Sequence, residues 1–358
     1  MRVNYLLSIT LTLIFFGCAN IVAPNGGEKD EKPPSLLDVK VVNKLKDKDK
    51  TSILFTFNEF IEIQKWEDCF YISPPEKIRT QKEINLKNLT LNFSESLNKN
   101  TTYHISLDEC IKDLNEGNIL DTLNYTFSLS NKKDTFSLNG ILNNSYTLQP
   151  IEKAWVMLFK EGVHDSIFFK STPNYVAKTD RKGRFYFPNL DTFNYTVLAL
   201  TDFDFIYDQK ELIAFNTSLI NPKNDSFISL FAFNPIIKED TISIIDTIVD
   251  THSSDSLLRK DVSYGNLTII TPNKKSCVFL LLQNDSIIKS YQFSNPPFLL
   301  TDIYPGEYRL KYIEDTDLNG KWTTGNWERK KQPEKVMNYP SEITIRSNWD
   351  LELEWSIY

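Results

Sequence analysis

In the stretch Ile53-Leu54-Phe55-Thr56-Phe57, every second side chain is large and apolar. The same period of two returns at residues 89–93, 103–107 and 125–129. Because successive side chains of a β-strand point to opposite faces, each stretch places its apolar residues on one face of a strand. Turn residues lie between the stretches, as at Ser73-Pro74-Pro75. This part of the chain therefore predicts a β-sandwich of about 95 residues.

Five short motifs in this region occur in an order that resembles a known family. They are Phe55-Thr56-Phe57-Asn58-Glu59, Leu89-Thr90-Leu91, Leu97 with Thr101-Thr102-Tyr103, residues 111–118, and Tyr125-Thr126-Phe127. The set resembles the SbsA-type bacterial Ig-like domain over a whole module, which we place at residues 35–131. Such domains resemble spacers in surface-layer proteins and lipoproteins, so the resemblance implies a fold and no reaction.

A second β-sandwich is predicted at residues 135–235. Its stretch Trp155-Val156-Met157-Leu158-Phe159 has no polar position, which indicates a strand buried on both faces. Residues 179–195 resemble the carboxypeptidase regulatory-like or prealbumin-like β-sandwich, although Asn194 stands where that family usually has Gly. The family is a non-catalytic appendage, so the resemblance implies no peptidase chemistry.

The rest of the chain predicts a linker and a third β-sandwich. Residues 236–262 are rich in Asp, Ser and Thr and contain no aromatic residue, which is typical of a linker. Residues 263–358 return to the period of two and repeat a spacing of the second module. Leu190 and Tyr195 are five residues apart, as are Ile303 and Tyr308, so we expect related sandwiches in tandem. The run 315–322, DTDLNGKW, resembles the C-terminal part of Bacteroidetes-type Ig-like lipoproteins.

The start of the chain predicts export and lipid attachment. Residues 5–16 form a 12-residue apolar stretch, which is too short to span a bilayer. It ends in Phe15-Phe16-Gly17-Cys18, which resembles the lipobox of bacterial lipoproteins, whose Cys receives the lipid. We therefore predict a lipoprotein signal peptide at residues 1–18, lipidation of Cys18 and a flexible tether at residues 19–34. An ordinary signal peptide with a chance Cys, or an N-terminal membrane anchor, is the alternative.

The predicted lipid places the chain in the cell envelope, and we expect the outer membrane, with its periplasmic or surface face left open. No later stretch approaches 18 consecutive apolar residues, so the lipid on Cys18 is the expected membrane contact. Lys and Arg number 40 against 47 Asp and Glu, a net charge of −7. The chain therefore lacks the positive field that gathers phosphates, and no nucleic-acid partner is predicted.

The remaining cysteines leave two interpretations open. Apart from Cys18 they are Cys69, Cys110 and Cys277, so at least one does not pair within the chain. Cys69 and Cys110 lie in the same predicted module, where they either form a disulfide or stay as buried thiols.

The sequence predicts no catalytic centre. The three histidines, His104, His164 and His252, fall on a strand face, in a loop and in the linker. The motifs of nucleophile elbows, zinc proteases, phosphate loops and thiol-redox pairs are absent. A glycosidase with an unrecognised pair of carboxylates stays as an alternative, because the fold sets the distance between such groups.

One loop resembles the start of a calcium-binding loop. Asp315, Asp317 and Asn319 alternate before Gly320, which allows the sharp turn, and Glu328 is the acid that would close the shell. The alternative is a solvated turn. A looser analogue in the second module contains Asp202, Asp204, Asp208 and Glu211. The polar loop at residues 113–118 is expected to be a tight turn rather than a calcium site, and no other cofactor is predicted.

Three functions are compatible with these observations. The leading hypothesis is a non-enzymatic envelope lipoprotein whose Ig-like modules act as a spacer and interaction scaffold for envelope proteins. The first alternative is a surface lipoprotein that binds glycans or proteins, with Trp322, Trp327 and Tyr339 as aromatic residues that would stack on sugar rings if exposed together. The second is the glycosidase.

Overall fold

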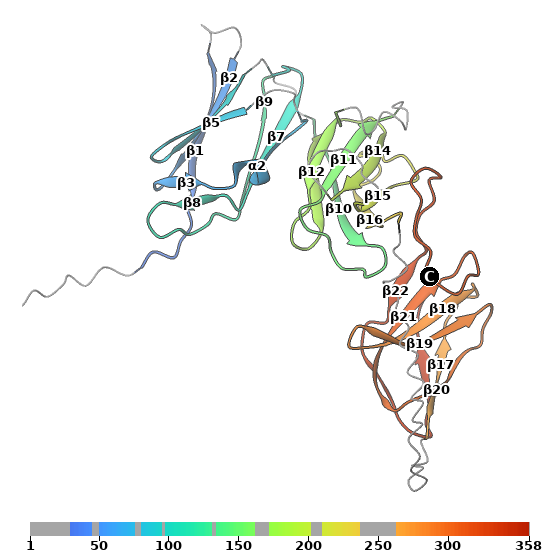
Figure 1. Ribbon diagram of the computed structural model, residues 1–358. Coiled ribbons are helices and arrows are strands. Elements are labelled where there is room, and N and C mark those ends of the chain that lie inside the picture. Colours follow the sequence, from blue (N-terminus) through green and yellow to red (C-terminus); the bar gives the residue numbers. More distant parts are fainter. Residues whose placement is uncertain are drawn as a thin grey trace, which may run out of the picture. The chain divides into compact units, whose positions relative to one another are not determined.

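The computed structural model describes residues 29–44, 50–75, 80–94, 97–130, 134–161, 172–201, 210–236 and 263–357 (Figure 1). Regular structure within them is almost entirely β-strand, and the single helix among them, α2 (Trp66–Cys69), has four residues. This confirms the predicted all-β fold of tandem β-sandwiches. None of the described helical structure is long and apolar enough to cross a membrane. The predicted signal peptide and nearly all of the predicted linker lie outside the described residues.

The chain divides into two compact units, which interleave along the sequence. The first comprises Met1–Cys69, Thr80–Asn92 and Asp108–Thr122. The second comprises Phe70–Arg79, Phe93–Leu107 and Leu123–Tyr358.

The first unit contains a four-stranded sheet in the order β1-β2-β6-β5. These strands are β1 (Leu36–Lys44), β2 (Lys50–Phe57), β5 (Thr80–Asn85) and β6 (Asn88–Phe93). In the antiparallel pair β2 and β6, Ile53 lies opposite Leu91 and Phe55 opposite Leu89, and all four side chains are buried. Residues opposite each other share a face, so the period of two gives this sheet one apolar side, as predicted. A smaller sheet pairs β3 (Ile61–Ile63) with β8 (Ile111–Asp113).

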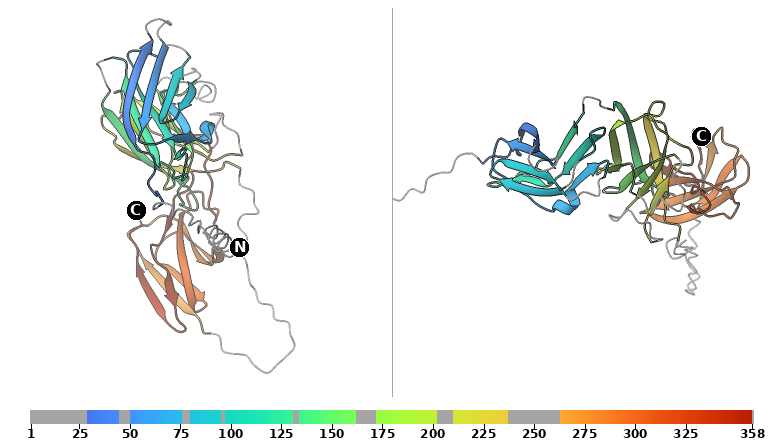
Figure 2. Two further views of the ribbon diagram at one scale, coloured as in Figure 1. Left: turned by 90° about the vertical axis from the view of Figure 1, so that its left-hand side faces the viewer. Right: turned by 90° about the horizontal axis from the view of Figure 1, so that it is seen from above.

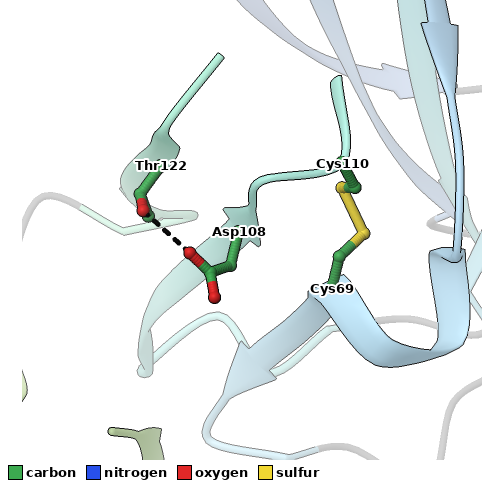
Figure 3. The surroundings of a disulfide bond; sticks show 4 residues. All are labelled: Cys69, Asp108, Cys110 and Thr122. Carbon is green, nitrogen blue, oxygen red and sulfur yellow. Dashed lines mark hydrogen bonds between the residues drawn. A yellow bond between two sulfur atoms is a disulfide. The ribbon is translucent and has the colours of Figure 1, made fainter. Parts of the chain in front are cut away.

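A disulfide in this unit joins Cys69, at the end of α2, to Cys110, directly before β8 (Figure 3). Their Cα atoms are 6.0 Å apart, and the two residues are 41 positions apart in sequence. Beside the disulfide, the hydroxyl of Thr122 donates a 2.9 Å hydrogen bond to the carboxylate of Asp108. The pairing that the sequence left open is therefore formed, and Cys277 is a buried free thiol.

The second unit begins with a three-stranded sheet in the order β4-β7-β9. Its strands are β4 (Phe70–Ser73), β7 (Thr102–Asp108) and β9 (Thr122–Ser128). The rings of Tyr103 and Phe127 stack with centroids 5.4 Å apart. The Tyr103 hydroxyl accepts a hydrogen bond from the backbone amide of Asn98, which ties the preceding turn to this sheet.

Residues 134–236 form the second sandwich, from the sheets β13-β10-β16 and β12-β11-β14-β15. Its strands are β10 (Phe136–Asn144), β11 (Trp155–Lys160), β12 (Tyr175–Lys178), β13 (Arg184–Leu190), β14 (Tyr195–Leu200), β15 (Ile213–Phe215) and β16 (Phe227–Ala232). Both sheets contribute to one buried core, with Leu138 and Leu142 from β10 and Val156 and Leu158 from β11. A Cβ at Gly140 would lie 2.1 Å from the Phe185 ring, so glycine lets that ring lie against the backbone.

Residues 263–357 form the third sandwich, from the sheets β20-β17-β24 and β19-β18-β21-β22, with β23 also paired to β21. Its strands are β17 (Gly265–Ile270), β18 (Cys277–Gln283), β19 (Ser286–Phe293), β20 (Phe298–Ile303), β21 (Gly306–Glu314), β22 (Val336–Asn338), β23 (Ile343–Ile345) and β24 (Asp350–Glu354). Figure 2 shows these strands, in orange to red, from two further sides.

The second and third sandwiches have the same strand order, which confirms the predicted repeat. Each first strand pairs antiparallel on one side and parallel on the other. The repeated five-residue spacing marks equivalent places, because Leu190 ends β13 and Ile303 ends β20. Tyr195 and Tyr308, five residues later, each donate a hydroxyl hydrogen bond to the residue four positions earlier.

Candidate functional site

The predicted lipid-attachment residue, Cys18, lies outside the described residues, as do His164, His252, Asp202, Asp204 and Asp208. Glu211, the remaining member of the looser acidic loop, is half-buried. His104 lies on β7, and the other candidate residues that the structure places belong to the turn at Asp113 and to the third sandwich.

The segment between β21 and β22, residues 315–335, packs against the second sandwich. The Trp327 ring meets Phe215 of β15 edge-on at 5.0 Å, and both belong to one buried cluster. The Thr324 hydroxyl donates a 2.7 Å hydrogen bond to the carbonyl of Asn234, and the Gln332 amide donates one of 2.8 Å to the carbonyl of Phe215. We call these contacts the joint.

The joint has a second half, made by the hairpin at residues 146–149 of the second sandwich. Tyr146 and Leu148 pack with Trp322 on a buried cluster from β18, β19, β21 and β22. The sheet β19-β18-β21-β22 is thus covered on its outer face as well as on the face toward its own core. The same holds for β11, whose Trp155, Met157 and Phe159 join the Trp327 cluster. The outer contacts explain why both strands read as continuous apolar runs.

The three aromatic residues expected to stack on sugars do not form an exposed patch, which corrects that prediction. Trp327 is only 8% exposed and lies in the joint. Trp322 is half-buried against both joint clusters, and its indole donates a hydrogen bond to the carbonyl of Glu334. Tyr339 packs edge-on against Trp355 at 5.4 Å. The two tryptophans thus use their apolar surface in packing, and Tyr339 is half-buried beside Trp355.

The predicted calcium loop begins with a buried aspartate. Asp315 is 1% exposed, and its carboxylate accepts hydrogen bonds from the backbone amides of Asn319 and Gly320 and from the side-chain amide of Gln292, at 3.0–3.1 Å. Gly320 has a φ of 73°, which favours glycine. The side-chain oxygen of Asn319 accepts a hydrogen bond from the backbone amide of Lys321, so this side chain caps the turn.

Three acids meet at this loop. Carboxylate oxygens of Asp315, Asp317 and Glu334 lie within 4.8 Å of one another. Glu334 is 4% exposed and accepts hydrogen bonds from the amides of Thr316 and Thr323. Glu328, the acid that the sequence suggested for closing the shell, is exposed and outside this group. The structure thus brings the predicted acids Asp315 and Asp317 together, adds Glu334 and leaves Glu328 outside the group.

The turn at Asp113 is built in a similar way around one acid. The carboxylate of Asp113 accepts hydrogen bonds of 2.5–3.0 Å from the backbone amides of Glu116, Gly117 and Asn118. Gly117 has a φ of 80°. Burial raises the pKa of Asp113, but these amides outweigh it and the net pKa is lowered. The expected tight turn is therefore present.

A cleft of about 780 Å³ opens beside the joint. The hairpin at residues 146–149 forms one wall, and β21 with the turn between β18 and β19 forms the other. Lys311 lies between them and is 6% exposed. Its ammonium donates a 2.6 Å hydrogen bond to the carbonyl of Tyr146 and lies 4.5 Å from the centre of that ring. Burial and the nearby Arg309 charge lower the pKa of Lys311 to about 8.

Two further titratable groups, His104 and Cys277, are buried and held in their uncharged forms near pH 7. Burial lowers the pKa of His104 to about 4, against a hydrogen bond to Asn124 that raises it, so the ring is neutral near pH 7. Burial and the Asp315 charge raise the pKa of the Cys277 thiol to about 12. Cys277 is thus held as a thiol rather than as a nucleophilic thiolate.

Sequence reasoning missed Glu334 and Lys311. Glu334 is 19 positions beyond Asp315, outside the span of a contiguous calcium loop. Lys311 alternates with Leu310 and Tyr312, so the pattern assigns it to a solvated face. The only available signal was the continuous apolar sequence of the neighbouring strand, Cys277–Gln283, which indicates that the outer face is covered.

Comparison with known proteins identifies one part of the chain. Residues 30–129 match a bacterial Ig-like domain. This Ig-like match includes β1 to β9 and the disulfide, and it agrees with the fold expected for that stretch. No curated protein matches the chain.

Among solved structures, the chain is similar to the TIE protein of Bacillus anthracis, at 11% identity and a TM-score of 0.18, covering 93% of this chain and 59% of that one. It is similar to native alpha-2-macroglobulin of Escherichia coli over domains MG0-NIE-MG1, at 11% identity and a TM-score of 0.23, covering 86% and 97%. It is also similar to BcpA, the major pilin subunit of Bacillus cereus, at 9% identity and a TM-score of 0.20, covering 56% and 70%. The chain thus spans 59% of the length of the TIE protein. TM-scores this low do not bear on function.

Proposed function

We propose that this protein is a non-enzymatic envelope lipoprotein, anchored by lipid on Cys18, whose Ig-like and related β-sandwiches form a spacer and interaction scaffold. The joint is the observation that supports it most. It buries Trp327 with Phe215 and adds two hydrogen bonds between side chains of one sandwich and backbone carbonyls of the next. Consecutive sandwiches that share a buried cluster resist rotation against each other, as a spacer requires.

A second contact between consecutive elements supports the same proposal. The backbone amide of Val176 in β12 donates a 3.0 Å hydrogen bond to the hydroxyl of Ser73 in β4. Nearby, the rings of Tyr71 and Trp155 meet edge-on at 5.4 Å. Sheet β4-β7-β9 therefore contacts the second sandwich through strand residues.

Anchoring is tested by metabolic labelling with alkyne-palmitate in the native host, followed by separation of membranes. The wild type should carry label and sediment with membranes, because lipid on Cys18 holds it there. Cys18→Ser should lose both properties. Cys277→Ala, which removes a buried thiol, is the matched control and should keep both. A labelled, membrane-bound Cys18→Ser protein would overturn the proposed anchor.

We propose a calcium ion at Asp315, Asp317 and Glu334 as a second function of the third sandwich. The observation in its favour is the approach of three carboxylates within 4.8 Å, because like charges so close repel one another and a cation between them would offset that repulsion. Carboxylate oxygens are the ligands that calcium prefers. Each carboxylate oxygen has two lone pairs, so the amide hydrogen bonds leave acceptor sites for an ion.

A further inference from the structure

The cleft beside the joint has the volume of a binding site and a polar wall. Its volume of about 780 Å³ falls within the roughly 300–1,000 Å³ of small-molecule sites. Its wall contains hydroxyl and amide side chains from both sandwiches, namely Thr147, Gln149, Ser286 and Asn338. These groups donate and accept hydrogen bonds, which suits a ligand rich in hydroxyls.

Two cations line this cleft in a chain of net charge −7. Arg309 and Lys311 are two positions apart on β21, so they project from the same side of that strand. Arg309 pairs with Asp285, whose side chain is 87% exposed at the rim. Lys311 forms no ion pair with any of the described residues, and one hydrogen bond to the Tyr146 carbonyl leaves two of its three donors for a ligand.

We propose that this cleft binds a small acidic sugar, with its carboxylate held between Arg309 and Lys311 and its hydroxyls facing the polar wall. A buried ammonium without a counter-charge is costly, and a carboxylate beside it offsets that cost. The singly charged sugar acid is favoured over inorganic phosphate because Asp285, at the same rim, repels the more highly charged anion. The site goes beyond the anchored scaffold and does not depend on the lipid.

The test is calorimetric titration of the purified full-length chain with glucuronate, with glucose and inorganic phosphate as separate arms, at constant ionic strength and pH 7. Glucuronate should bind, and glucose and phosphate should bind at least tenfold more weakly. Equal binding of glucose would overturn the role of the cations. Equal binding of phosphate would overturn the sugar assignment.

Exposed residues at the rim give the decisive variants, because their substitution leaves the core intact. Arg309→Gln should weaken glucuronate binding about tenfold or more, the effect of losing a charge-assisted hydrogen bond. Asp285→Asn should strengthen it, since Arg309 no longer shares its charge with a neighbouring carboxylate. Arg329→Gln, an exposed arginine outside the cleft, is the matched control and should leave affinity unchanged. Unchanged affinity in both rim variants would overturn the proposal.

Discussion

The turns at Asp113 and Asp315 use the same device in different surroundings. In each, a buried aspartate accepts backbone amides four and five residues ahead, and a glycine at positive φ completes the turn. At Asp113 the turn follows a disulfide-bonded Cys110. At Asp315 two further carboxylates approach within 4.8 Å. A buried acid in a polar loop is thus explained by amide capping, and additional acids are what distinguish a candidate cation site.

Of the substitutions that test the two turns, removal of the disulfide should cause the largest loss of stability. Substituting Cys69→Ala and Cys110→Ala frees a loop of 41 residues, and loop-closure entropy predicts a loss of about 4 kcal/mol in unfolding free energy. The loss should appear in urea denaturation and as faster hydrogen exchange at residues 108–122. The Asp315 turn, which has no disulfide, should exchange as in the wild type. An unchanged denaturation midpoint would show that the turn does not need the crosslink.

Substitution of Asp315, the capping acid in the third sandwich, should lower the unfolding free energy by somewhat less. Asp315→Ala leaves two backbone amides and the Gln292 amide without their acceptor. Unsatisfied buried donors cost about 1–3 kcal/mol each, and partial access to water brings the expected loss to roughly 3 kcal/mol in urea denaturation. Asp315→Asn keeps one acceptor oxygen and should lose clearly less. Equal losses in the two variants would mean that charge, rather than capping, is what the turn requires.

The buried cation Lys311, on the neighbouring strand, should make stability depend on pH above 8. The pKa of Lys311 falls from 10.5 in the unfolded chain to about 8, because of burial and Arg309. Between these values the unfolded chain binds more protons, so stability should rise by about 2 kcal/mol from pH 8 to pH 10. Tyr146 and Arg309 face this group, and burial raises the pKa of Tyr146 above its usual 10.

Lys311→Met is the reference for that measurement, because it keeps the length of the side chain and removes the titration. The difference in unfolding free energy between the two proteins should change with pH over this window. A constant difference would show that Lys311 keeps an ordinary pKa in the folded protein.

The strand pattern was predictable because it depends on local period, whereas the site depends on contacts between distant segments. Ile53, Phe55 and Phe57 are buried as the alternation requires. Cys110 could be named as a possible partner of Cys69, but whether the bond forms was left open, because it depends on α2 lying beside the start of β8. Whether Trp327 is exposed or packed was not predictable, since an isolated aromatic in a loop gives no sign of the neighbouring sandwich that covers it.

Calcium binding should have the smallest effect on stability, and it is the property in which the two turns are expected to differ most directly. An extracellular-type site with a dissociation constant of about 10⁻⁴ M would stabilise the third sandwich by roughly 1.4 kcal/mol at tenfold excess calcium. Its melting temperature in the full-length chain should therefore rise by a few degrees in millimolar calcium relative to chelator. The Asp113 turn, with its single capping acid, should give no calcium response of its own.

Two exposed acids distinguish the structural ligand set from the one that the sequence suggested. Asp317→Asn removes one charge from the group of three acids and should abolish the calcium shift. Glu328→Gln removes a charge from an exposed side chain outside that group and should retain the full shift. If Glu328→Gln abolished the shift and Asp317→Asn kept it, Glu328 would be a calcium ligand and the proposed site around Glu334 would be wrong. If calcium leaves the wild-type melting curve unchanged, the acids at Asp315 only cap the turn. The Asp315 loop then differs from the Asp113 loop only in the number of acids that it contains.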